Sequence, residues 1–247
     1  MNILNQAADP KPGTIPKNPY VDVPELMKPH QLNDLTLPKF IIDDLKRRIA
    51  TNSIENMLFY GKPGTGKSSA ANLIMSELTE WNQRSLDGRN GIGPVTFKEK
   101  IVHYARNSFI SSSRRICFID NVNYMSEKVR NELYRLIRDT PNTCRFILAA
   151  NSKGRDLESS ALRPIWFNAR PPRDIDVQAH LFRQYESRLS EAGIHFDRKT
   201  LIKIVSAYFP NLQDIANGVQ NEFIEPDTRS VSSSSSFRSL LRGDGNE

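Results

Sequence analysis

The segment GKPGTGKS, residues 61–68, constrains the fold more than any other feature of this chain. It fits the pattern G-x-x-x-x-G-K-[ST], in which glycines let backbone N–H groups converge on phosphate oxygens. The apolar run Asn56–Tyr60 precedes it and a helical pattern over Ser68–Trp81 follows it. A glycine turn that matches by chance is the alternative. The order of strand, loop and helix favours a phosphate-binding loop.

The chemistry of such a loop assigns roles to its last residues. The lysine reaches the β- and γ-phosphates of a nucleotide, and the hydroxyl after it ligates Mg²⁺. These roles fall on Lys67 and Ser68. The following helix turns its positive N-terminal end toward the same anion. We therefore expect ATP and Mg²⁺ as cofactors, with nucleotide contacts from Gly61, Lys62, Pro63, Gly64, Thr65, Gly66, Lys67, Ser68 and Ser69.

Two polar residues follow other apolar runs. Asp120 ends the run Ile116–Asp120, where a carboxylate could hold the Mg²⁺, although Asp120-Asn121 also suits a turn. Asn151 ends the run RFILAAN, and it could orient the attacking water or bond the γ-phosphate, or simply begin a turn. Open α/β sheets bind ligands at the carboxyl ends of their strands. We therefore assign Asp120 to the metal and both residues to the catalytic site.

Apolar runs alternate with amphipathic segments as far as Pro171. Strands are expected at Asn56–Tyr60, Ile116–Ile119, Arg145–Ala150 and Ile165–Phe167, with helices between them, among them Leu37–Ala50, Thr96–Phe109 and Ser126–Arg138. This alternation predicts an α/β fold, a parallel sheet with helices on both faces. Three helical patterns without strands follow, at Asp174–Glu191, Arg198–Tyr208 and Leu212–Phe223. We expect a disordered segment at 1–20, a nucleotide-binding domain at 21–171, a small helical domain at 172–225 and a flexible serine-rich tail at 226–247.

Composition limits the environment and the partners. The 247 residues include 34 Lys and Arg against 28 Asp and Glu, and residues 81–115 carry most of the net charge of +6. A solvated helix face or an acidic partner would explain this segment. No apolar run approaches 18 residues, so no membrane contact is expected. Cys117 and Cys144 lie in apolar runs and are expected to be core residues of a cytoplasmic protein, with a disulfide as the alternative.

Together these motifs resemble AAA+ ATPases, and more narrowly the small subunits of sliding-clamp loaders of the replication factor C and bacteriophage type. The resemblance covers roughly residues 24–225. It rests on NMLFYGKPGTGKSSAA, the run Ile116–Asp120, RFILAAN and the three helical patterns after the sheet. Lys28-Pro29, Leu35 and Leu37-Pro38 resemble the family's segment that packs on adenine. The stretch Ser85–Arg89 falls where the family has a short loop near DNA.

The resemblance implies an ATP-binding clamp-loader subunit with a three-helix lid. Such a subunit assembles with other subunits in a ring, grips primer–template DNA and loads a sliding clamp. It implies that Pro29 contacts the nucleotide and that DNA phosphates meet Arg89, Lys98, Lys100 and Arg106. The phage-like features imply a viral protein in the cytoplasm of a bacterial host.

The sequence also departs from the family pattern. Asn121 stands where the family has a glutamate that activates water, and an amide can hold water but cannot accept its proton. The family's finger arginine falls on Ala161, with Arg163 two residues on, and the lid arginine falls on Gln213. The family's C-terminal collar helices have no counterpart before residue 247. These departures favour an alternative, an ATP-binding adaptor or scaffold subunit without its own turnover. A small-molecule kinase is disfavoured because the helical domain follows the sheet.

Overall fold

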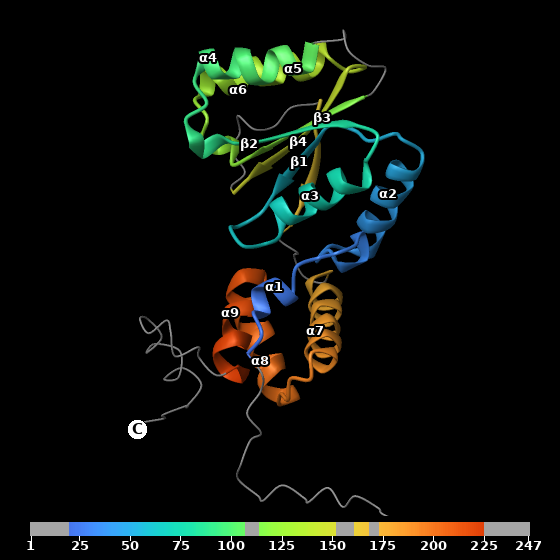
Figure 1. The fold of residues 1–247 in the computed structure, drawn as a ribbon, viewed down its shortest axis with the longest axis vertical. Coiled ribbons are helices and arrows are strands. Elements are labelled where there is room, and N and C mark those ends of the chain that lie inside the picture. The colour runs from blue at the N-terminus through green and yellow to red at the C-terminus, as the bar shows by residue number, and fades with distance from the viewer. Residues whose placement is uncertain (1–19, 107–113, 152–160, 168–172, 225–247) are drawn as a thin grey trace, which may run out of the picture.

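The computed structural model of this chain describes residues 20–106, 114–151, 161–167 and 173–224. Apart from Tyr20, the expected disordered end segments lie outside these residues. Figure 1 shows an upper lobe that contains the sheet and a lower lobe built of helices. The phosphate loop, residues 61–68, lies where the lobes meet, because the Leu212 N–H of the lower lobe donates to the Gly64 carbonyl oxygen at 2.8 Å.

A five-stranded sheet forms the centre of the upper lobe, with the strand order β2-β3-β4-β1-β5. All four neighbouring pairs run parallel, which confirms the predicted parallel sheet. Because parallel strands end at one edge, the phosphate loop, Asp120 and Asn151 gather there. The strands are β1 (Met57–Tyr60), β2 (Asn82–Asp87), β3 (Arg115–Asp120), β4 (Cys144–Ala150) and β5 (Arg163–Trp166).

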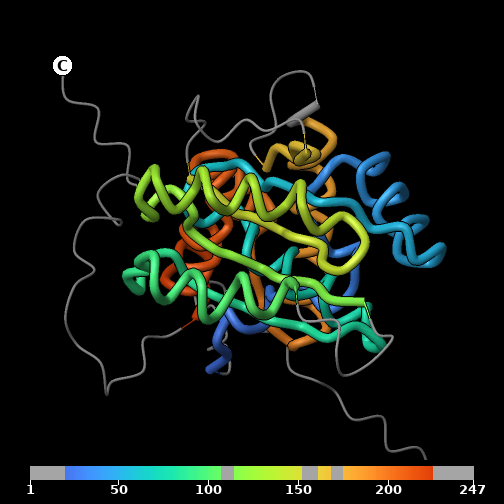
Figure 2. The backbone as a smooth tube through the Cα atoms, turned by 90° about the horizontal axis from the view of Figure 1, so that it is seen from above, coloured from blue at the N-terminus to red at the C-terminus, as the bar shows by residue number. Residues whose placement is uncertain are grey.

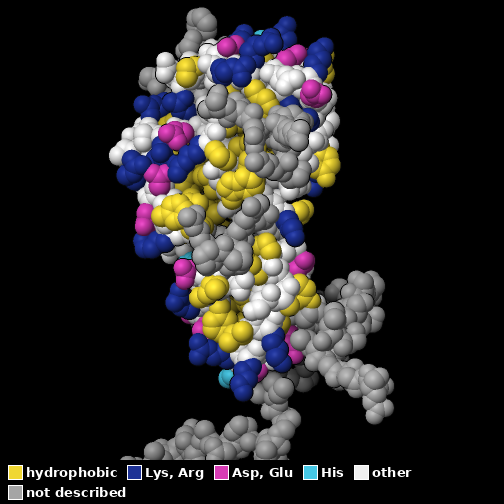
Figure 3. Space-filling view, turned by 180° about the vertical axis from the view of Figure 1, so that it is seen from behind, with side chains coloured by type: hydrophobic (Ala, Val, Ile, Leu, Met, Phe, Trp, Pro, Cys, Tyr) yellow, Lys and Arg dark blue, Asp and Glu magenta, His cyan; other side chains and the backbone are white. Residues whose placement is uncertain are grey.

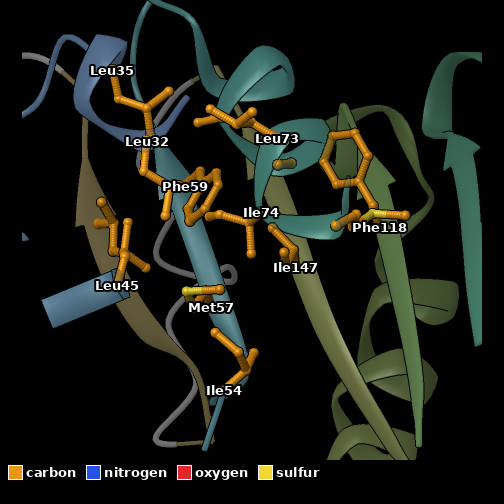
Figure 4. Close-up of a cluster of buried hydrophobic side chains, with 14 of the residues drawn as sticks. Leu32, Leu35, Leu45, Ile54, Met57, Phe59, Leu73, Ile74, Phe118 and Ile147 are labelled. Atoms are coloured by element: carbon orange, nitrogen blue, oxygen red, sulfur yellow. The ribbon is translucent and has the colours of Figure 1, made fainter. Parts of the chain in front are cut away.

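Helices α2 (Lys39–Ala50) and α3 (Lys67–Glu77) cover one face of the sheet (Figures 1 and 2). Alternate strand residues point to opposite faces, so Phe59 and Phe118 enter this layer while their neighbours face the other way. Figure 4 shows these rings packed with Ile74 of α3 between the strands and the helices. This core fixes the start of α3, and with it Lys67 and Ser68, relative to the sheet.

The opposite face of the sheet is covered by a second helical layer. Leu58, Cys117 and Ile119 face it, packed with Leu133. The expected helix Thr96–Phe109 is divided here, with a π-helical turn in its middle, and residues 107–113 lie outside the described residues. The layer consists of α4 (Pro94–Phe97), the π-helical η3 (Lys98–Val102), α5 (His103–Arg106) and α6 (Glu127–Asp139), with the short turns η2 (Gly88–Asn90) and η4 (Val122–Tyr124) beside them. The predicted α/β sandwich is confirmed.

Strand β2 corrects one expectation, because Ser85–Asp87 were expected in a loop and are the end of an edge strand. Its register places Asp87 opposite Asp120 of β3. The strand sequence NQRSLD is polar and its first four residues are exposed. An edge strand with solvent on both faces carries no apolar signal, so the hydrophobic pattern missed it. Only Gly88 and Arg89 of the expected loop lie outside β2, in η2.

The lower lobe consists of α7 (Arg173–Glu191), α8 (Arg198–Tyr208) and α9 (Leu212–Phe223), close to the three expected helices. The short helix α1 (Val23–Leu26) joins them (Figure 1). Val23 is fully buried in this cluster, and its N–H donates to Gln220 Oε1 of α9 at 2.7 Å. Arg188 of α7 donates to the Leu26 carbonyl oxygen at 3.0 Å. The boundary near residue 172 stays a prediction, since 168–172 are not described.

The composition led to two expectations, one about the two cysteines and one about a membrane-spanning helix. Cys117 and Cys144 are buried and free of any disulfide, as expected of core residues. Burial raises the pKa of both thiols, that of Cys144 to about 12. Within the described ranges, no helix has the length and the apolar run needed to cross a bilayer.

Candidate nucleotide-binding site

The phosphate loop connects the end of β1 to the start of α3. Gly64 and Gly66 adopt the left-handed conformation, with φ of 76° and 88°. The left-handed region favours glycine, because glycine has no Cβ that would clash with the backbone. A Cβ on Gly64 would also overlap Asn211 Oδ1 of the lower lobe. The two glycines therefore let the loop curl tightly under the neighbouring helix.

Lys67 is the first residue of α3, and its side chain points back into the phosphate loop. The residue is only 5% exposed, and its Nζ donates to the carbonyl oxygens of Gly61 and Lys62, both at 2.8 Å. Burial lowers the pKa of the ammonium, and the charge of Asp120 acts in the opposite direction. The loop thus holds a buried cation, the group that a nucleotide's phosphates require.

Ser68 and Asp120 meet although 52 residues separate them. Ser68 Oγ donates to Asp120 Oδ2 at 2.6 Å, and the Asn121 N–H donates to Asp120 Oδ1 at 2.8 Å. Asn121 itself adopts the left-handed conformation, with φ of 53°. A hydroxyl and a carboxylate side by side are the hard oxygen donors that Mg²⁺ prefers. The geometry fits the predicted metal site.

A cavity of about 340 Å³ opens beside the loop, between the two lobes. Thr65, Gly66 and Ser69 line it from the loop, and Pro29 lines it from the segment after α1. The remaining walls come from the N-terminal segment, from Phe167 after β5, from α7 and from α9, and include Asp34, Leu35, Tyr185, Leu212 and Gln213. The cavity has both polar and apolar walls and adjoins the phosphate loop, so it is suited to a nucleoside. Of the loop residues expected to contact the nucleotide, Gly61, Lys62, Pro63, Gly64, Lys67 and Ser68 are not among its lining residues.

Asn121 and Asn151 lie in one chain of hydrogen bonds. Asn151 Nδ2 donates to Asn121 Oδ1 at 3.4 Å, and Asn121 Nδ2 donates to Asp87 Oδ1 at 3.1 Å. Asp87 also accepts from Arg89 Nη2 at 2.7 Å. The Arg89 guanidinium holds the pKa of Asp87 below its usual range. Asp87 is therefore an ionised carboxylate that fixes the amide of Asn121.

Asp87 is the functional candidate that the sequence did not reveal. Its position depends on β2 lying next to β3, and no sequence motif predicts that pairing. A Cβ on Gly88 would overlap the carbonyl oxygen of Asn121, so this glycine is what lets the chain after Asp87 pass so close. The Asp-Gly pair was the one available signal, and it indicates a turn rather than a site.

The start of α9 lies against the phosphate loop. Asn211 caps this helix, with its Oδ1 accepting from the Gln213 N–H at 3.1 Å. Leu212 bonds to the Gly64 carbonyl oxygen, as described above. Gln213, expected at the place of the family's lid arginine, lines the cavity. The lower lobe therefore contributes uncharged polar groups to the site from this helix end.

The predicted DNA-binding residues all lie on the segments that follow β2. Arg89 is on η2, Lys98 and Lys100 are on η3, and Arg106 is on α5. Arg89 is paired with Asp87, and Arg106 Nη2 lies 3.4 Å from Asp139 Oδ2. In the part of the chain that the structure describes, Lys98 and Lys100 are exposed and form no ion pair. Figure 3 shows Lys and Arg side chains gathered at the upper end of the molecule, where Figure 1 places α4, α5 and α6.

Arg163 does not lie with the nucleotide residues. It begins β5 opposite Met57, at the edge of the sheet where the strands start. Its Nη1 is paired with Asp44 Oδ2 and lies 3.9 Å from Glu55 Oε2. The guanidinium is therefore engaged within this chain. Ala161, at the expected finger position, lies two residues before the start of β5.

Residues 57–169 match the family described as "ATPase family associated with various cellular activities (AAA)". Curated relatives extend the similarity. The replication factor C small subunit of Haloarcula marismortui is 28% identical over 210 residues, covering 83% of this chain and 63% of that protein. The replication factor C small subunit of Natronomonas pharaonis is 27% identical over 204 residues, covering 79% and 60%. Replication factor C subunit 4 of Caenorhabditis elegans is 30% identical over 166 residues, covering 62% and 50%.

Solved structures show the same fold. The Thermotoga maritima RuvB Holliday junction branch migration motor superposes with a TM-score of 0.54 at 16% identity, covering 78% of this chain and 63% of that one. A point mutant of the same RuvB gives a TM-score of 0.57 at 15% identity, covering 77% and 63%. This chain spans about 60% of the length of the first curated relatives. Residues 57–169 are therefore similar to the AAA family, the described part of the chain has the P-loop fold of that family, and the chain is similar to the small subunits of replication factor C over most of its length.

Proposed function

We propose that this chain is the ATP-binding AAA+ subunit of a DNA-replication clamp loader. It would assemble with other subunits, grip primer–template DNA and load a sliding clamp. The observation that carries the ATP-binding part is the contact of Ser68 with Asp120 beside a phosphate loop that curls around Lys67. The names of the curated relatives support the clamp-loading part.

Nucleotide binding divides between the two lobes. The backbone N–H groups of the loop and the Lys67 ammonium would hold the β- and γ-phosphates, and the nucleoside would fill the cavity beside Pro29. Ser68 and Asp120 would hold the Mg²⁺, whose chemistry when bound is to neutralise charge on the phosphate oxygens. Because α7 and α9 form part of the cavity wall, a bound nucleotide would fix the angle between the lobes.

The rate of ATP hydrolysis would depend on the side chains that lie beside the γ-phosphate. Asn151 directly follows β4 at the same edge of the sheet as the phosphate loop, and its side-chain amide donates to Asn121. Asn121 can orient a water molecule but cannot take its proton, so the chain's own turnover would be slow. Its neighbour Asp87 is a carboxylate within hydrogen-bond distance. The adaptor without turnover is the competing function that Asn121 favours.

DNA binding would use the basic side chains that follow β2. Lys98 and Lys100 are exposed and unpaired within the described ranges, so they can approach phosphates without first breaking an ion pair. Arg89 and Arg106 would have to exchange their carboxylate partners for phosphates. Contacts of this kind are independent of sequence and weaken with salt.

One assay tests the proposal. ATP turnover is measured for the full chain with candidate partner subunits, with and without primed DNA and a sliding clamp, and Lys67→Ala serves as the control. Turnover that DNA and clamp raise to about 1 s⁻¹, the low end of ordinary enzymes, is expected of the loader. ATP binding without stimulated turnover would identify the adaptor. No ATP binding, alone or in complex, would overturn both.

A further inference from the structure

A second cavity, of about 320 Å³, lies at the opposite edge of the sheet, where β3 and β4 begin. We call it the arginine cavity. Arg115 starts β3 and Asp120 ends it, so roughly 16 Å of strand separate this cavity from the metal residues. Its walls include Asn52, Trp81, Arg114, Arg115, Thr143 and Arg145.

Among the residues that the structure describes, the walls carry three positive charges and no carboxylate. Within the described ranges, Arg114, Arg115 and Arg145 form no ion pair. Glu55 acts electrostatically on Arg145 but is itself paired with Arg48 at 2.8 Å. Burial and the charge of Arg114 lower the pKa of Arg145. A cluster of cations, of which Arg115 and Arg145 are half-buried and Arg114 is exposed, attracts an anion when no carboxylate pairs with it.

Two of the guanidiniums are held in place by the fold. Arg114 Nη1 donates to the Asn52 carbonyl oxygen, and its guanidinium lies 5.6 Å from the centre of the Trp81 ring. Trp81 Nε1 in turn donates to Asn52 Oδ1 at 2.8 Å. Arg145 Nε donates to the Ile54 carbonyl oxygen at 2.8 Å. A guanidinium has five N–H donors, so each keeps donors for a ligand.

The hydroxyl of one residue that lines the cavity also lacks a partner. Thr143 Oγ1 is buried and makes no hydrogen bond within the part of the chain that the structure describes. A buried polar atom without a partner costs stability, and such atoms are rare in native proteins. An anion bound between the arginines would supply the missing acceptor.

We propose that the arginine cavity binds a phosphate group, either inorganic phosphate or a small phosphomonoester. Guanidinium groups and a hydroxyl match the several acceptor oxygens of a dianionic phosphate, which a single carboxylate offers less fully. The cavity volume leaves room for a small group attached to the phosphate. This site is independent of the ATP site and of the proposed function.

Trp81 provides the readout, because Trp81 and Trp166 are the two tryptophans of the chain. In Trp166→Phe the fluorescence reports on the arginine cavity alone. Inorganic phosphate and glycerol phosphate are titrated separately, with chloride and acetate at the same ionic strength. A saturable phosphate response with a Kd of about 1 mM or tighter is expected. Whichever phosphate binds tighter identifies the source of the ligand.

Variants in the same Trp166→Phe background locate the site. Arg114→Gln is expected to weaken phosphate binding about tenfold and Thr143→Val about fivefold. Thr143→Val keeps the shape of the side chain and removes a buried hydroxyl that has no partner, so it is expected to keep or raise the melting temperature, and a folding defect cannot mimic the loss. Arg135→Gln on α6 removes the same charge from an exposed position as Arg114→Gln and is expected to change nothing. Lys67→Ala is expected to leave the response intact.

Four results would overturn the proposal. The first is a fluorescence response to phosphate that does not saturate or that chloride reproduces, and the second is a response that acetate matches or exceeds. The third is loss of the phosphate response in Lys67→Ala. The fourth is phosphate affinity that Thr143→Val leaves unchanged.

Discussion

The side-chain amide of Asn121 donates to Asp87 Oδ1 at 3.1 Å, which places a carboxylate beside the position where the family resemblance puts a glutamate. Asn121→Glu alone would set two carboxylates against each other, and such a pair resists ionisation of both members. We expect this variant to raise ATP turnover only slightly. Exchanging both residues, Asn121→Glu with Asp87→Asn, restores the hydrogen bond and is expected to raise turnover about tenfold or more.

The measurement is a double-mutant cycle on DNA-stimulated turnover, with Asp87→Asn as the remaining corner. ATP affinity, determined by calorimetry, is expected to stay within about twofold in all four proteins. If the single variant performs as well as the exchange, Asp87 does not act on position 121.

The metal site predicts a loss that depends on Mg²⁺. Ser68→Ala removes the hydroxyl that meets Asp120, so ATP affinity is expected to fall about tenfold with Mg²⁺ and to stay unchanged in EDTA. Ser76→Ala on the same helix removes a hydroxyl that donates to the Leu73 carbonyl oxygen, and it is expected to have no effect. Calorimetric titration of ATP under both conditions measures this difference. Equal losses with and without Mg²⁺ would remove Ser68 from the metal site.

The basic segment predicts a change in salt dependence. Replacing Lys98 and Lys100 together by Gln is expected to reduce the slope of log affinity for DNA against log salt by about 2. The control replaces Lys199 and Lys203 by Gln, which removes the same charge from the exposed side of α8. Fluorescence anisotropy with primed DNA at several salt concentrations gives both slopes. Identical slopes in the two variants would show that Lys98 and Lys100 do not contact DNA.

Helix α9 and the phosphate loop predict a coupled effect. Asn211→Ala removes a helix cap and is expected to lower the free energy of unfolding by about 1 kcal/mol. Because Asn211 lies against Gly64, we also expect ATP affinity to fall about fivefold. Asp197→Ala removes the corresponding cap of α8, away from the loop, and is expected to affect stability alone. Melting curves and ATP titrations of both variants check this; equal ATP affinities would contradict it.

Asp44 predicts a pH dependence of stability. Hydrogen bonds from Arg48, Arg163 and Arg47 hold the pKa of Asp44 well below its usual range. The ionised form therefore stabilises the fold above the ordinary aspartate pKa of about 4, and this contribution is lost as the pH falls toward the lower, folded-state value. We expect Asp44→Asn to cost about 1–2 kcal/mol at neutral pH and progressively less below about pH 4.

Urea unfolding at pH 7, 4 and 3 measures that difference. Asp43→Asn is the control, because Asp43 is 53% exposed in its pair with Lys39 and surface pairs contribute less than about 1 kcal/mol. A cost of Asp44→Asn that does not change with pH would show that its carboxylate charge is not what stabilises the fold.

The sequence was sufficient for those parts of the site that local patterns encode. The phosphate loop has a fixed spacing, and Asp120 and Asn151 follow apolar strands, so their meeting at one edge of the sheet could be predicted. Strand β2 could not be predicted. It lies at the edge of the sheet, where it pairs only with β3, and its polar sequence has no hydrophobic pattern. The contact of Asp87 with Asn121 depends on that pairing, and so it too was hidden.

Contacts between distant segments were equally out of reach. Nothing in the residues around Val23 indicates that they pack on α9 rather than on the sheet. The arginine cavity joins a turn near Asn52 to the starts of β3 and β4, which are distant in the sequence. Hydrophobic periodicity reports which face of an element is buried but does not name its neighbour.

Helix α1 has a consequence for how this protein can be divided. Because α1 is anchored on α9 and the chain then runs past Pro29 to the sheet, one wall of the nucleoside cavity travels with the helical lobe. A fragment restricted to residues 57–169 would keep the phosphate loop but lose the cavity walls that α1, α7 and α9 supply. If the cavity holds the nucleoside as proposed, selectivity for the base would come from segments that lie before and after the sheet in the sequence.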